Sequence, residues 1–416
     1  MKMTARQNIL VMKFGGTSVA DPEKIQRAAD RAVAARRRGR AVAVVVSAPG
    51  DMTDELLTLA RRVAAEPDDR ELDQLLATGE QVGIALFAMA CRARGAPAVS
   101  LTGAQAGIDA GGDHTRAQIV RIRAGKILRE LQAGRIVTVA GFQGVTPGRD
   151  VATLGRGGSD LTAVALACAL KTRECEIYTD VKGVYTADPR IVSEARKLDR
   201  ITAAEMLELA GAGAQVMQPR SMEVAERFGV SIHVRSAFHP QPGTWIIPKE
   251  KAMLEKAFVS ALALDKSEVR LNLMDLPDRP GVAAQVLAAL AEARIPVDMI
   301  VQSAPARTGV NAISLMTPRA FAAKAQEALA PIARRLGARV DIRDQVAKIS
   351  AVGTGFRHHP WIAAKMFAAL AEHKINIHMI VASDLRISAV VDAHHGETAL
   401  RALHRAYGLA RKKKSR

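Results

Sequence analysis

Aromatic side chains and cysteines are scarce in this sequence of 416 residues. Phe, Trp and Tyr together make up 3% of the chain. The cores must therefore be built from aliphatic side chains, and an aromatic platform that stacks on single-stranded nucleic acid is not expected. The three cysteines do not form a CxxC pair and the ten histidines show no metal-binding spacing. We therefore expect buried free thiols in a reducing compartment and no metal site built by the protein itself.

Long apolar runs are absent as well. No run approaches 18 apolar residues, and the first 12 residues contain no apolar leader segment. These absences predict a cytoplasmic protein that does not enter a membrane.

The charge is strongly basic, with 59 Lys and Arg against 42 Asp and Glu and a net charge of +17. Five of the last six residues, 411–416, are basic. No helix-turn-helix, zinc-finger or RNP pattern accompanies the charge, so we do not expect nucleic-acid binding. An anionic nucleotide substrate and solvated surfaces account for the excess.

The first part of the chain, from residue 8 to 247, alternates short β-rich runs with longer helical runs. Strands are predicted at 9–14, 41–46, 136–140, 174–178 and 232–234. Helices are predicted at 21–37, 54–64, 71–94, 161–170, 202–210 and 221–228. This alternation predicts an α/β domain with a mostly parallel sheet sandwiched by helices.

The second part repeats a different unit. Strands at 268–274, 297–302, 310–316 and 338–342, with helices at 281–294 and 319–336, give the βαββαβ order of a ferredoxin-like unit. A related copy follows at 347–407, because the run at 375–381 parallels the run at 295–301. This copy lacks its last strand, which we expect the apolar run 258–264 to supply. The expected domains are 1–248, an inserted unit at 266–344, a unit made of 255–265 and 345–410, and a basic tail at 411–416.

Two glycine-rich segments carry the chemical signal. No Walker A sequence and no HRD or DFG motif occurs, which excludes those two phosphoryl-transfer folds. Instead, residues 13–18 read KFGGTS after a predicted strand, and residues 155–160 read GRGGSD before a predicted helix. Either segment alone can be a tight turn. Together they place a lysine, an arginine and backbone amides at the carboxyl ends of parallel strands, where a migrating phosphoryl group can be bound.

These motifs resemble those of the aspartate kinase family. The similar segments run in order through nearly the whole chain, at 13–20, 46–56, 78–80, 102–107, 141–144, 153–160, 178–181 and 185–190. The resemblance implies the amino-acid-kinase fold followed by two ACT domains. It also implies an enzyme that phosphorylates the side-chain carboxylate of L-aspartate with ATP, at the first step of lysine, threonine and methionine biosynthesis.

The resemblance further implies roles for individual residues. Lys13, Glu80 and Asp160 would be catalytic, with Lys13 on the transferring phosphate and Asp160 organising the reaction centre. The substrate-binding residues would be Thr17, Thr53, Glu80, Arg156, Gly157, Gly158 and Ser159, with Arg156 on the α-carboxylate of aspartate and Glu80 near its ammonium group. The ATP-binding residues would be Lys13, Phe14, Gly15, Gly16, Ser47, Ser159, Thr179, Asp180, Tyr185, Asp188, Arg190 and Gln215. Mg²⁺ would be carried mainly by the ATP phosphates.

Two of these residues could have a structural role instead of a functional one. Glu80 can lie on a solvated helix face, although we expect Thr78-Gly79 to interrupt the helix there. Tyr185 can be a packing residue.

The two ACT copies would bind lysine, threonine or both as effectors, and would join chains into a dimer or tetramer. The effector residues would be Asp278, Gly281, Ala283, Asp298, Gln302, Asn376 and Ile377. Asp278 has an alternative role as the N-terminal cap of the helix that follows it.

Three positions depart from the family pattern. Gln215 stands where many relatives have a phosphate-facing lysine, Lys182 stands where Asp is usual, and Trp361 replaces a small residue in the second ACT copy. We expect Gln215 to weaken the ATP contact without inactivating the enzyme. The alternatives are an ACT-type sensor with a weakened kinase half, which Gln215 favours slightly, and a kinase for another acid, which the tandem ACT copies disfavour.

Overall fold

The computed structural model describes residues 8–214, 216–248, 258–303 and 309–410. Its contacts divide the chain into two compact units. The first contains Met1–Val184, Lys197–Ala210 and Gln215–Met253, and the second contains Tyr185–Arg196, Gly211–Ala214 and Leu254–Arg416.

An eight-stranded sheet forms the centre of the first unit, in the order β10-β12-β11-β9-β1-β2-β6-β3. Its strands are β1 (Ile9–Phe14), β2 (Ala41–Val46), β3 (Ala98–Leu101), β6 (Ile136–Ala140), β9 (Glu174–Thr179), β10 (Arg200–Thr202), β11 (Ser231–Ser236) and β12 (Thr244–Ile247). All neighbours pair in parallel except β11 with β12. The mostly parallel sheet predicted from the buried Val- and Ala-rich runs is therefore confirmed.

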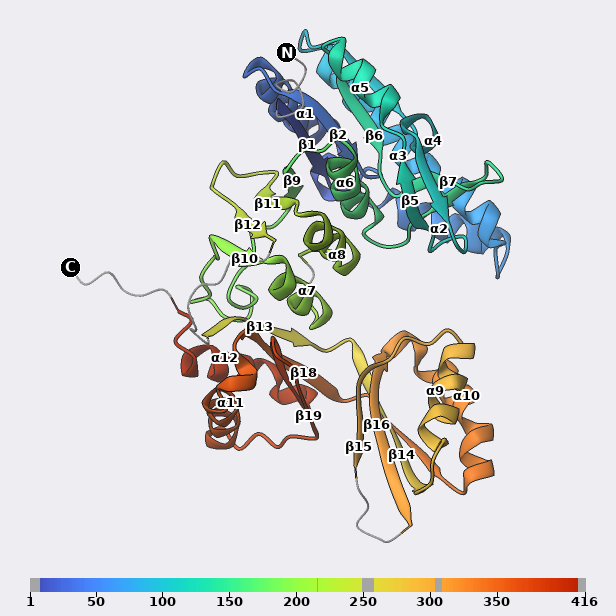
Figure 1. The fold of residues 1–416 in the computed structure, drawn as a ribbon, viewed down its shortest axis with the longest axis vertical. Coiled ribbons are helices and arrows are strands. Elements are labelled where there is room, and N and C mark those ends of the chain that lie inside the picture. Colours follow the sequence, from blue (N-terminus) through green and yellow to red (C-terminus); the bar gives the residue numbers. More distant parts are fainter. Residues whose placement is uncertain (1–7, 215, 249–257, 304–308, 411–416) are drawn as a thin grey trace, which may run out of the picture. The chain divides into compact units, whose positions relative to one another are not determined.

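Helices pack on both faces of this sheet (Figure 1). The helices of this part of the chain are α1 (Pro22–Arg37), α2 (Met52–Val63), α3 (Asp69–Arg92), α4 (Gly103–Ala106), α5 (Gly125–Gln132), α6 (Gly158–Ala169), α7 (Ala203–Gly211) and α8 (Pro219–Phe228). Of these, α1, α3, α5 and α6 contact the central strands β1, β2 or β6. Met12 and Phe14 of β1 join one apolar cluster with Ile25 of α1 and Phe87 of α3. Because side chains alternate along a strand, Lys13 must face the other side of the sheet, where α6 lies.

A second, small sheet in the first unit was not predicted. It has the order β5-β4-β7-β8 and contains β4 (Ile108–Gly111), β5 (Gln118–Ile122), β7 (Gln143–Val145) and β8 (Val151–Thr153). These strands are three to five residues long, and β5 is largely exposed. They therefore lack the continuous apolar pattern from which the main sheet was predicted.

The second unit contains two ferredoxin-like sheets, as predicted. The first sheet has the order β15-β16-β14-β17, with β14 (Glu268–Pro277), β15 (Asp298–Ser303), β16 (Val310–Pro318), β17 (Arg339–Arg343), α9 (Val282–Glu292) and α10 (Ala322–Leu336). The second has the order β13-β18-β20-β19, with β13 (Phe258–Asp265), β18 (Val346–Thr354), β19 (Met379–Ala382), β20 (Arg386–Asp392), α11 (Trp361–Glu372) and α12 (Gly396–Ala406). Strand β13 pairs antiparallel with β18, at the edge that β17 occupies in the first sheet.

One described helix, α3, is long and apolar enough by composition to cross a membrane. Half of that stretch is buried inside the protein, where α3 packs against α1 and against β3 and β6. It also carries two buried carboxylates, Asp73 and Glu80. These features are those of a core helix.

Candidate active site

The carboxyl ends of four neighbouring strands bring together segments that lie far apart in the sequence. The residues that end or nearly end these strands are in register: Phe14, Val46, Ala140 and Tyr178. The residues that follow them are therefore neighbours on one edge of the sheet: Gly15, Ser47, Gly141 and Thr179. In parallel sheets this edge is the usual place for a ligand.

Lys13 and Asp160 form an ion pair at this edge. The Nζ atom of Lys13 lies 2.6 Å from Oδ1 of Asp160, which stands in the first turn of α6. The two side chains are only 12% and 13% exposed. A helix N-terminus offers free amides and a positive dipole end. A cation held there is suited to bind a phosphoryl group.

Glycine backbone approaches Lys13 closely. A β-carbon at Gly15 would lie 3.3 Å from the lysine Nζ. A β-carbon at Gly16 would lie 2.8 Å from the carbonyl oxygen of Ala48, so only glycine allows these two loops to approach each other. The loops that follow β1 and β2 are joined further by the Gly50 amide, which donates to the Gly16 carbonyl at 3.1 Å. The structure thus places Gly15 beside Lys13 and Gly16 against the loop after β2, while their role in a phosphate path remains a prediction.

Glu80 is buried beside the same loops. Its Oε1 accepts a hydrogen bond from the Ala48 amide at 3.1 Å, and the residue is 3% exposed. Its Oε2 is buried and has no hydrogen-bond partner in the described parts of the chain. Burial raises the pKa of Glu80 to about 7, although backbone hydrogen bonds act in the opposite direction. A buried carboxylate oxygen without a partner is costly, and a cationic ligand would satisfy it.

The predicted interruption of the helix at Thr78-Gly79 is wrong, because α3 continues through both residues. A β-carbon at Gly79 would lie 2.8 Å from Cβ of Ala48, and one at Gly83 would lie 2.7 Å from the carbonyl oxygen of Ser47. The glycines therefore serve close packing of α3 against the loop after β2. This packing brings the Ala48 amide to Glu80, and the alternative of a solvated face for Glu80 is excluded.

The turn from β8 to α6 carries Arg156. Gly155 and Gly157 have φ values of +77° and +71°, in the left-handed region that favours glycine. Arg156 between them is exposed. Gly158 and Ser159 open α6, and a β-carbon at Gly141 would lie 2.5 Å from Oγ of Ser159. Ser159 therefore lies at the sheet edge next to Asp160, and its role in binding remains a prediction.

Several predicted ligand-binding residues lie near the strand ends without a specific contact to the Lys13–Asp160 pair. Thr17 is exposed in the short helix η2 (Gly16–Val19), and Thr53 is half-buried in the first turn of α2. Thr179 follows in register at the end of β9, and its hydroxyl donates to Asp180 at 2.9 Å. The ring of Phe14 is fully buried in the core and its carbonyl accepts the Ser47 amide at 3.1 Å, so its nucleotide-binding role remains a prediction.

Three further predicted nucleotide-binding residues, Tyr185, Asp188 and Arg190, belong to the second unit. Tyr185 packs against the apolar core of the second ferredoxin-like sheet. Arg190 donates to both carboxylate oxygens of Asp188, with a shortest distance of 2.6 Å, and this hydrogen bonding lowers the pKa of Asp188. Gln215 lies outside the described residues. The predicted set is thus divided between the two units, with the boundary after Val184.

A cavity of about 340 Å³ lies in the first ferredoxin-like sheet, around the start of α9. Four of the predicted effector residues line it: Asp278, Gly281, Ala283 and Gln302. Asp278 does not cap α9, because the N-cap is Gly281 without a side-chain hydrogen bond. Oδ1 of Asp278 instead accepts a hydrogen bond from Nδ2 of Asn311, a further lining residue, at 2.6 Å. The capping alternative is therefore wrong.

Asp298, Asn376 and Ile377 do not line this cavity. The carboxylate of Asp298 lies 2.7 Å from Nζ of Lys348, which is fully buried and also lies 3.0 Å from Glu268. Burial alone would lower the pKa of Lys348, but the two carboxylates outweigh it and raise this pKa. Within one chain, Asp298 therefore already has a cationic partner, and its effector role remains a prediction.

Some residues near the two candidate sites were not predicted from the sequence, because they act through their backbone or through an ion pair. The Ala48 amide binds Glu80, and the Gly141 backbone packs on Ser159. A backbone donor leaves no side-chain pattern in the sequence. Lys348 was missed because a lysine inside an apolar strand gives no sign of its partners before the sheets are assembled.

Comparison with known proteins gives consistent results. Residues 8–236 match the amino acid kinase family, and residues 274–331 and 349–407 match the ACT domain. An aspartokinase of Thermus thermophilus is 46% identical over 402 residues, which cover 96% of this chain and 99% of that protein. The crystal structure of an aspartate kinase from Synechocystis is similar, with a TM-score of 0.82, 30% identity and coverage of 98% of this chain and 99% of that one.

The aspartokinase III of E. coli is similar in two states. Its complex with aspartate and ADP, the R-state, gives a TM-score of 0.81, and its complex with lysine and aspartate, the T-state, gives 0.76. In both cases the identity is 27%, and the match covers 96% of this chain and 99% of that one.

Proposed function

This chain belongs to the aspartate kinases of the amino acid kinase family, and from that premise we propose how its residues phosphorylate the side-chain carboxylate of L-aspartate with ATP. The observation that carries the proposal is the Lys13–Asp160 pair, 2.6 Å apart at the N-terminus of α6 and beside the Gly15 backbone. An oxygen of the aspartate side chain attacks the γ-phosphorus of ATP, ADP leaves, and an acyl phosphate forms. The attacking carboxylate is already ionised at neutral pH, so the enzyme needs no general base.

Lys13 supplies positive charge where negative charge develops during the transfer. Phosphoryl transfer is catalysed mainly by positioning and by electrostatic stabilisation of the migrating group. Asp160 holds the lysine ammonium at the N-terminus of α6, where the positive end of the helix dipole also favours a phosphate anion. A kinase that uses ATP requires a divalent metal, and we propose that Mg²⁺ enters as part of the nucleotide, on its phosphates.

Glu80 and Arg156 orient the amino-acid substrate. The unpartnered Oε2 of Glu80 is suited to the ammonium group of aspartate, and the exposed guanidinium of Arg156 is suited to its α-carboxylate. Thr17, Thr53, Gly157, Gly158 and Ser159 complete the proposed aspartate site. Phe14, Ser47, Thr179, Asp180, Tyr185, Asp188, Arg190 and Gln215 complete the proposed nucleotide site.

The cavity at the start of α9 is the proposed effector site. Asp278 offers a carboxylate to an ammonium group, and the first amides of α9 offer donors to a carboxylate, which are the two ends of an amino acid. Lysine is the first candidate because E. coli aspartokinase III was solved with lysine. Threonine is the second, and Asp298, Asn376 and Ile377 would contribute from outside the cavity.

The remaining assignments are proposals as well. We propose a cytoplasmic enzyme of lysine and threonine biosynthesis that forms a dimer or tetramer through its ACT domains. We also propose the domain bounds 1–248, 266–344 for the inserted ACT domain, and 255–265 with 345–410 for the other. Residues 411–416 would form a separate basic tail.

The role of Lys13 is tested by replacing it. Lys13→Ala should lower turnover at saturating substrates by at least about a hundredfold, which is the usual effect of removing one preorganised group at a developing anion. Lys24→Ala, which removes a lysine paired with Asp21 on α1, is the matched control and should leave turnover unchanged. A loss of less than about fivefold in Lys13→Ala would remove Lys13 from the transition state.

A further inference from the structure

A second buried carboxylate on α3 lies one heptad before Glu80. Asp73 is fully buried, and because it precedes Glu80 by two helical turns it lies on the same face of α3. The catalytic roles described above do not use it. A buried carboxylate is retained only when several donors satisfy it, so its partners show what it holds in place.

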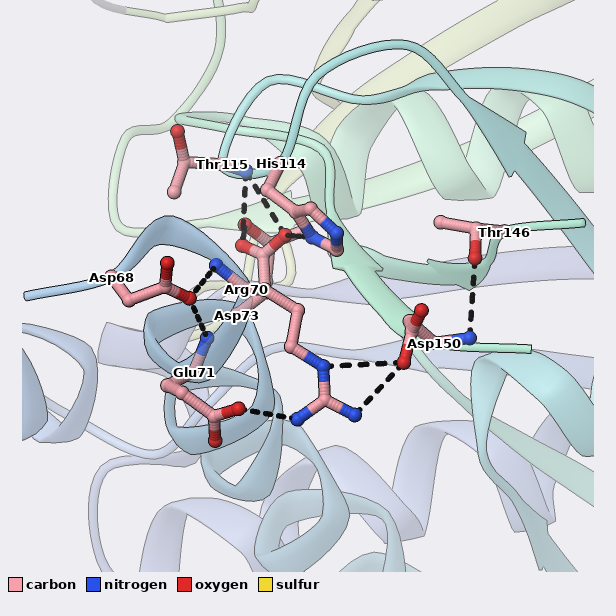
Figure 2. A network of polar contacts seen from close by, with 9 residues as sticks. Asp68, Arg70, Glu71, Asp73, His114, Thr115, Thr146 and Asp150 are labelled. Carbon is pink, nitrogen blue, oxygen red and sulfur yellow. Dashed lines mark hydrogen bonds and ion pairs between the residues drawn. The ribbon is translucent and has the colours of Figure 1, made fainter. Parts of the chain in front are cut away.

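The partners of Asp73 come from the loop after β4 and from the end of β8, and Figure 2 shows those of the loop, His114 and Thr115. The amide of Thr115 donates to both carboxylate oxygens, at 3.1 and 3.0 Å, and Nδ1 of His114 lies 2.8 Å from Oδ2. The hydroxyl of Thr153, the last residue of β8, donates to Oδ1. Asp73 thus joins α3 to the β4–β5 loop, residues 112–117, and to the end of β8.

Both of these segments contact the turn that carries Arg156. Thr153 precedes Arg156 by three residues, and its carbonyl accepts the Ala117 amide at 2.9 Å. A β-carbon at Gly155 would lie 3.2 Å from the carbonyl oxygen of Thr115, so the β4–β5 loop packs directly on the residue before Arg156.

Arg220 of α8 also binds the backbone of these two segments. Its guanidinium donates to the carbonyls of Leu154, at 2.7 Å, and of Ala117, at 3.0 Å. The backbone that leads into Arg156 is therefore held by a buried carboxylate from α3 and by a guanidinium from α8. The side chain of Gln218 also packs on this turn, because a β-carbon at Gly157 would lie 1.5 Å from its Cγ.

We propose that Asp73 is a positioning residue for aspartate binding, which acts by fixing the β4–β5 loop and the end of β8 so that Arg156 is preorganised for the α-carboxylate of aspartate. The proposal rests on the assignment of Arg156 under the proposed function. Preorganisation matters because every group that must be ordered during binding lowers the affinity. Loss of Asp73 therefore weakens aspartate binding and leaves ATP binding largely unchanged.

The test compares Thr153→Val with Thr153→Ser in the full-length chain. Valine has the shape of threonine but cannot donate to Asp73, whereas serine keeps the hydroxyl and loses only a methyl group. We expect Thr153→Val and Asp73→Asn to raise the aspartate KM about tenfold, as for loss of one hydrogen bond to a charged group, with the ATP KM within about twofold. Thr153→Ser should resemble the wild type.

Asp150→Asn is the matched control. Asp150 pairs with Arg70 in the first turn of α3, at 2.8 Å, and its amide donates to the hydroxyl of Thr146, at 3.1 Å (Figure 2). Its aspartate KM should not change. If Thr153→Ser raises the aspartate KM as much as Thr153→Val, or if both substrates are affected equally, the effect is a general loss of structure and the proposal is overturned.

A double-mutant cycle separates this inference from the proposed function. If Asp73 acts through Arg156, Asp73→Asn should not raise the aspartate KM further when Arg156 is already alanine. Additive effects would overturn the positioning role while leaving the assignment of Arg156 intact. An Arg156→Ala variant with an unchanged aspartate KM would instead refute that assignment. Thermal unfolding of each variant, and aspartate titration by calorimetry without ATP, complete the comparison.

Discussion

Replacing Glu80 with glutamine should stabilise the empty enzyme and at the same time weaken its substrate binding. Burial raises the pKa of this carboxyl from 4.5 to about 7. Because a tenfold change in acidity is worth about 1.4 kcal/mol, keeping the group charged above pH 7 costs about 3 kcal/mol. Glutamine has the same shape and can accept the Ala48 hydrogen bond, but it carries no charge.

The sign of the pH dependence follows from the raised pKa. Between pH 4.5 and 7 the unfolded chain releases this proton before the folded chain does, so the wild type loses stability as the pH rises through that window. Glutamine does not titrate. The advantage of Glu80→Gln should therefore be small at pH 5 and full at pH 8.

The size of the gain in thermal midpoint can be estimated in two steps. About 3 kcal/mol in a domain of this size corresponds to roughly 5–10 °C. The buried amide of glutamine lacks a second partner, which costs about 1–3 kcal/mol. The net gain is therefore up to about 2 kcal/mol, and we expect a thermal midpoint up to roughly 5 °C higher at pH 8.

Kinetics and unfolding must be measured on the same protein. The aspartate KM of Glu80→Gln should rise roughly 10- to 100-fold, the scale of a hydrogen bond to a charged group, while the ATP KM stays near that of the wild type. Glu55→Gln, at an exposed position in the first turn of α2, is the control for both assays. A Glu80→Gln variant that is less stable than the wild type at pH 8, or that binds aspartate normally, would refute the reasoning.

Two further predictions concern packing and control. Gly79→Ala should lose about 1–2 kcal/mol of stability despite the better helix propensity of alanine, because its β-carbon would lie 2.8 Å from Cβ of Ala48. Thermal unfolding measures this loss. The control is Gly125→Ala, which should not be destabilised because its β-carbon would approach only Nη1 of Arg129, at 4.0 Å. Lysine or threonine should bind the free enzyme in calorimetry and inhibit it with a matching constant, since an inhibitor must prefer the inhibited state. If neither binds at millimolar concentration, alone or together, the cavity at the start of α9 is not an effector site.

The strand ends that build the reaction centre were predictable from the sequence because they follow continuous apolar runs. The run Ala41–Val46 is almost entirely buried, which is typical of a strand in a parallel sheet that helices cover on both faces. The end of such a run therefore predicts the residue at which the strand ends. The glycines near Lys13 could be recognised because they directly follow such a predicted strand. The comparisons confirm the family that these motifs predicted.

The parts that were missed depend on contacts between distant segments. Gly79 was interpreted as a break in a helix, but its conformation is helical. Glycine is needed there because Ala48 packs too closely for a β-carbon. Asp278 fits the pattern of an N-terminal cap, but its carboxylate accepts a hydrogen bond from Asn311, which is 33 residues away. Local pattern gives no access to such partners, because propensity and spacing describe only neighbours along the chain.

The central claim is tested most directly by the acceptor dependence of ADP release. With saturating Mg-ATP, the wild-type enzyme should release ADP rapidly with L-aspartate and only at a background rate without an acceptor. L-Glutamate has one more methylene group and should be roughly 10- to 200-fold less effective, the range that one methylene gives in a fitted site. Equal rates with aspartate and glutamate, or equal rates with aspartate and no acceptor, would contradict the account.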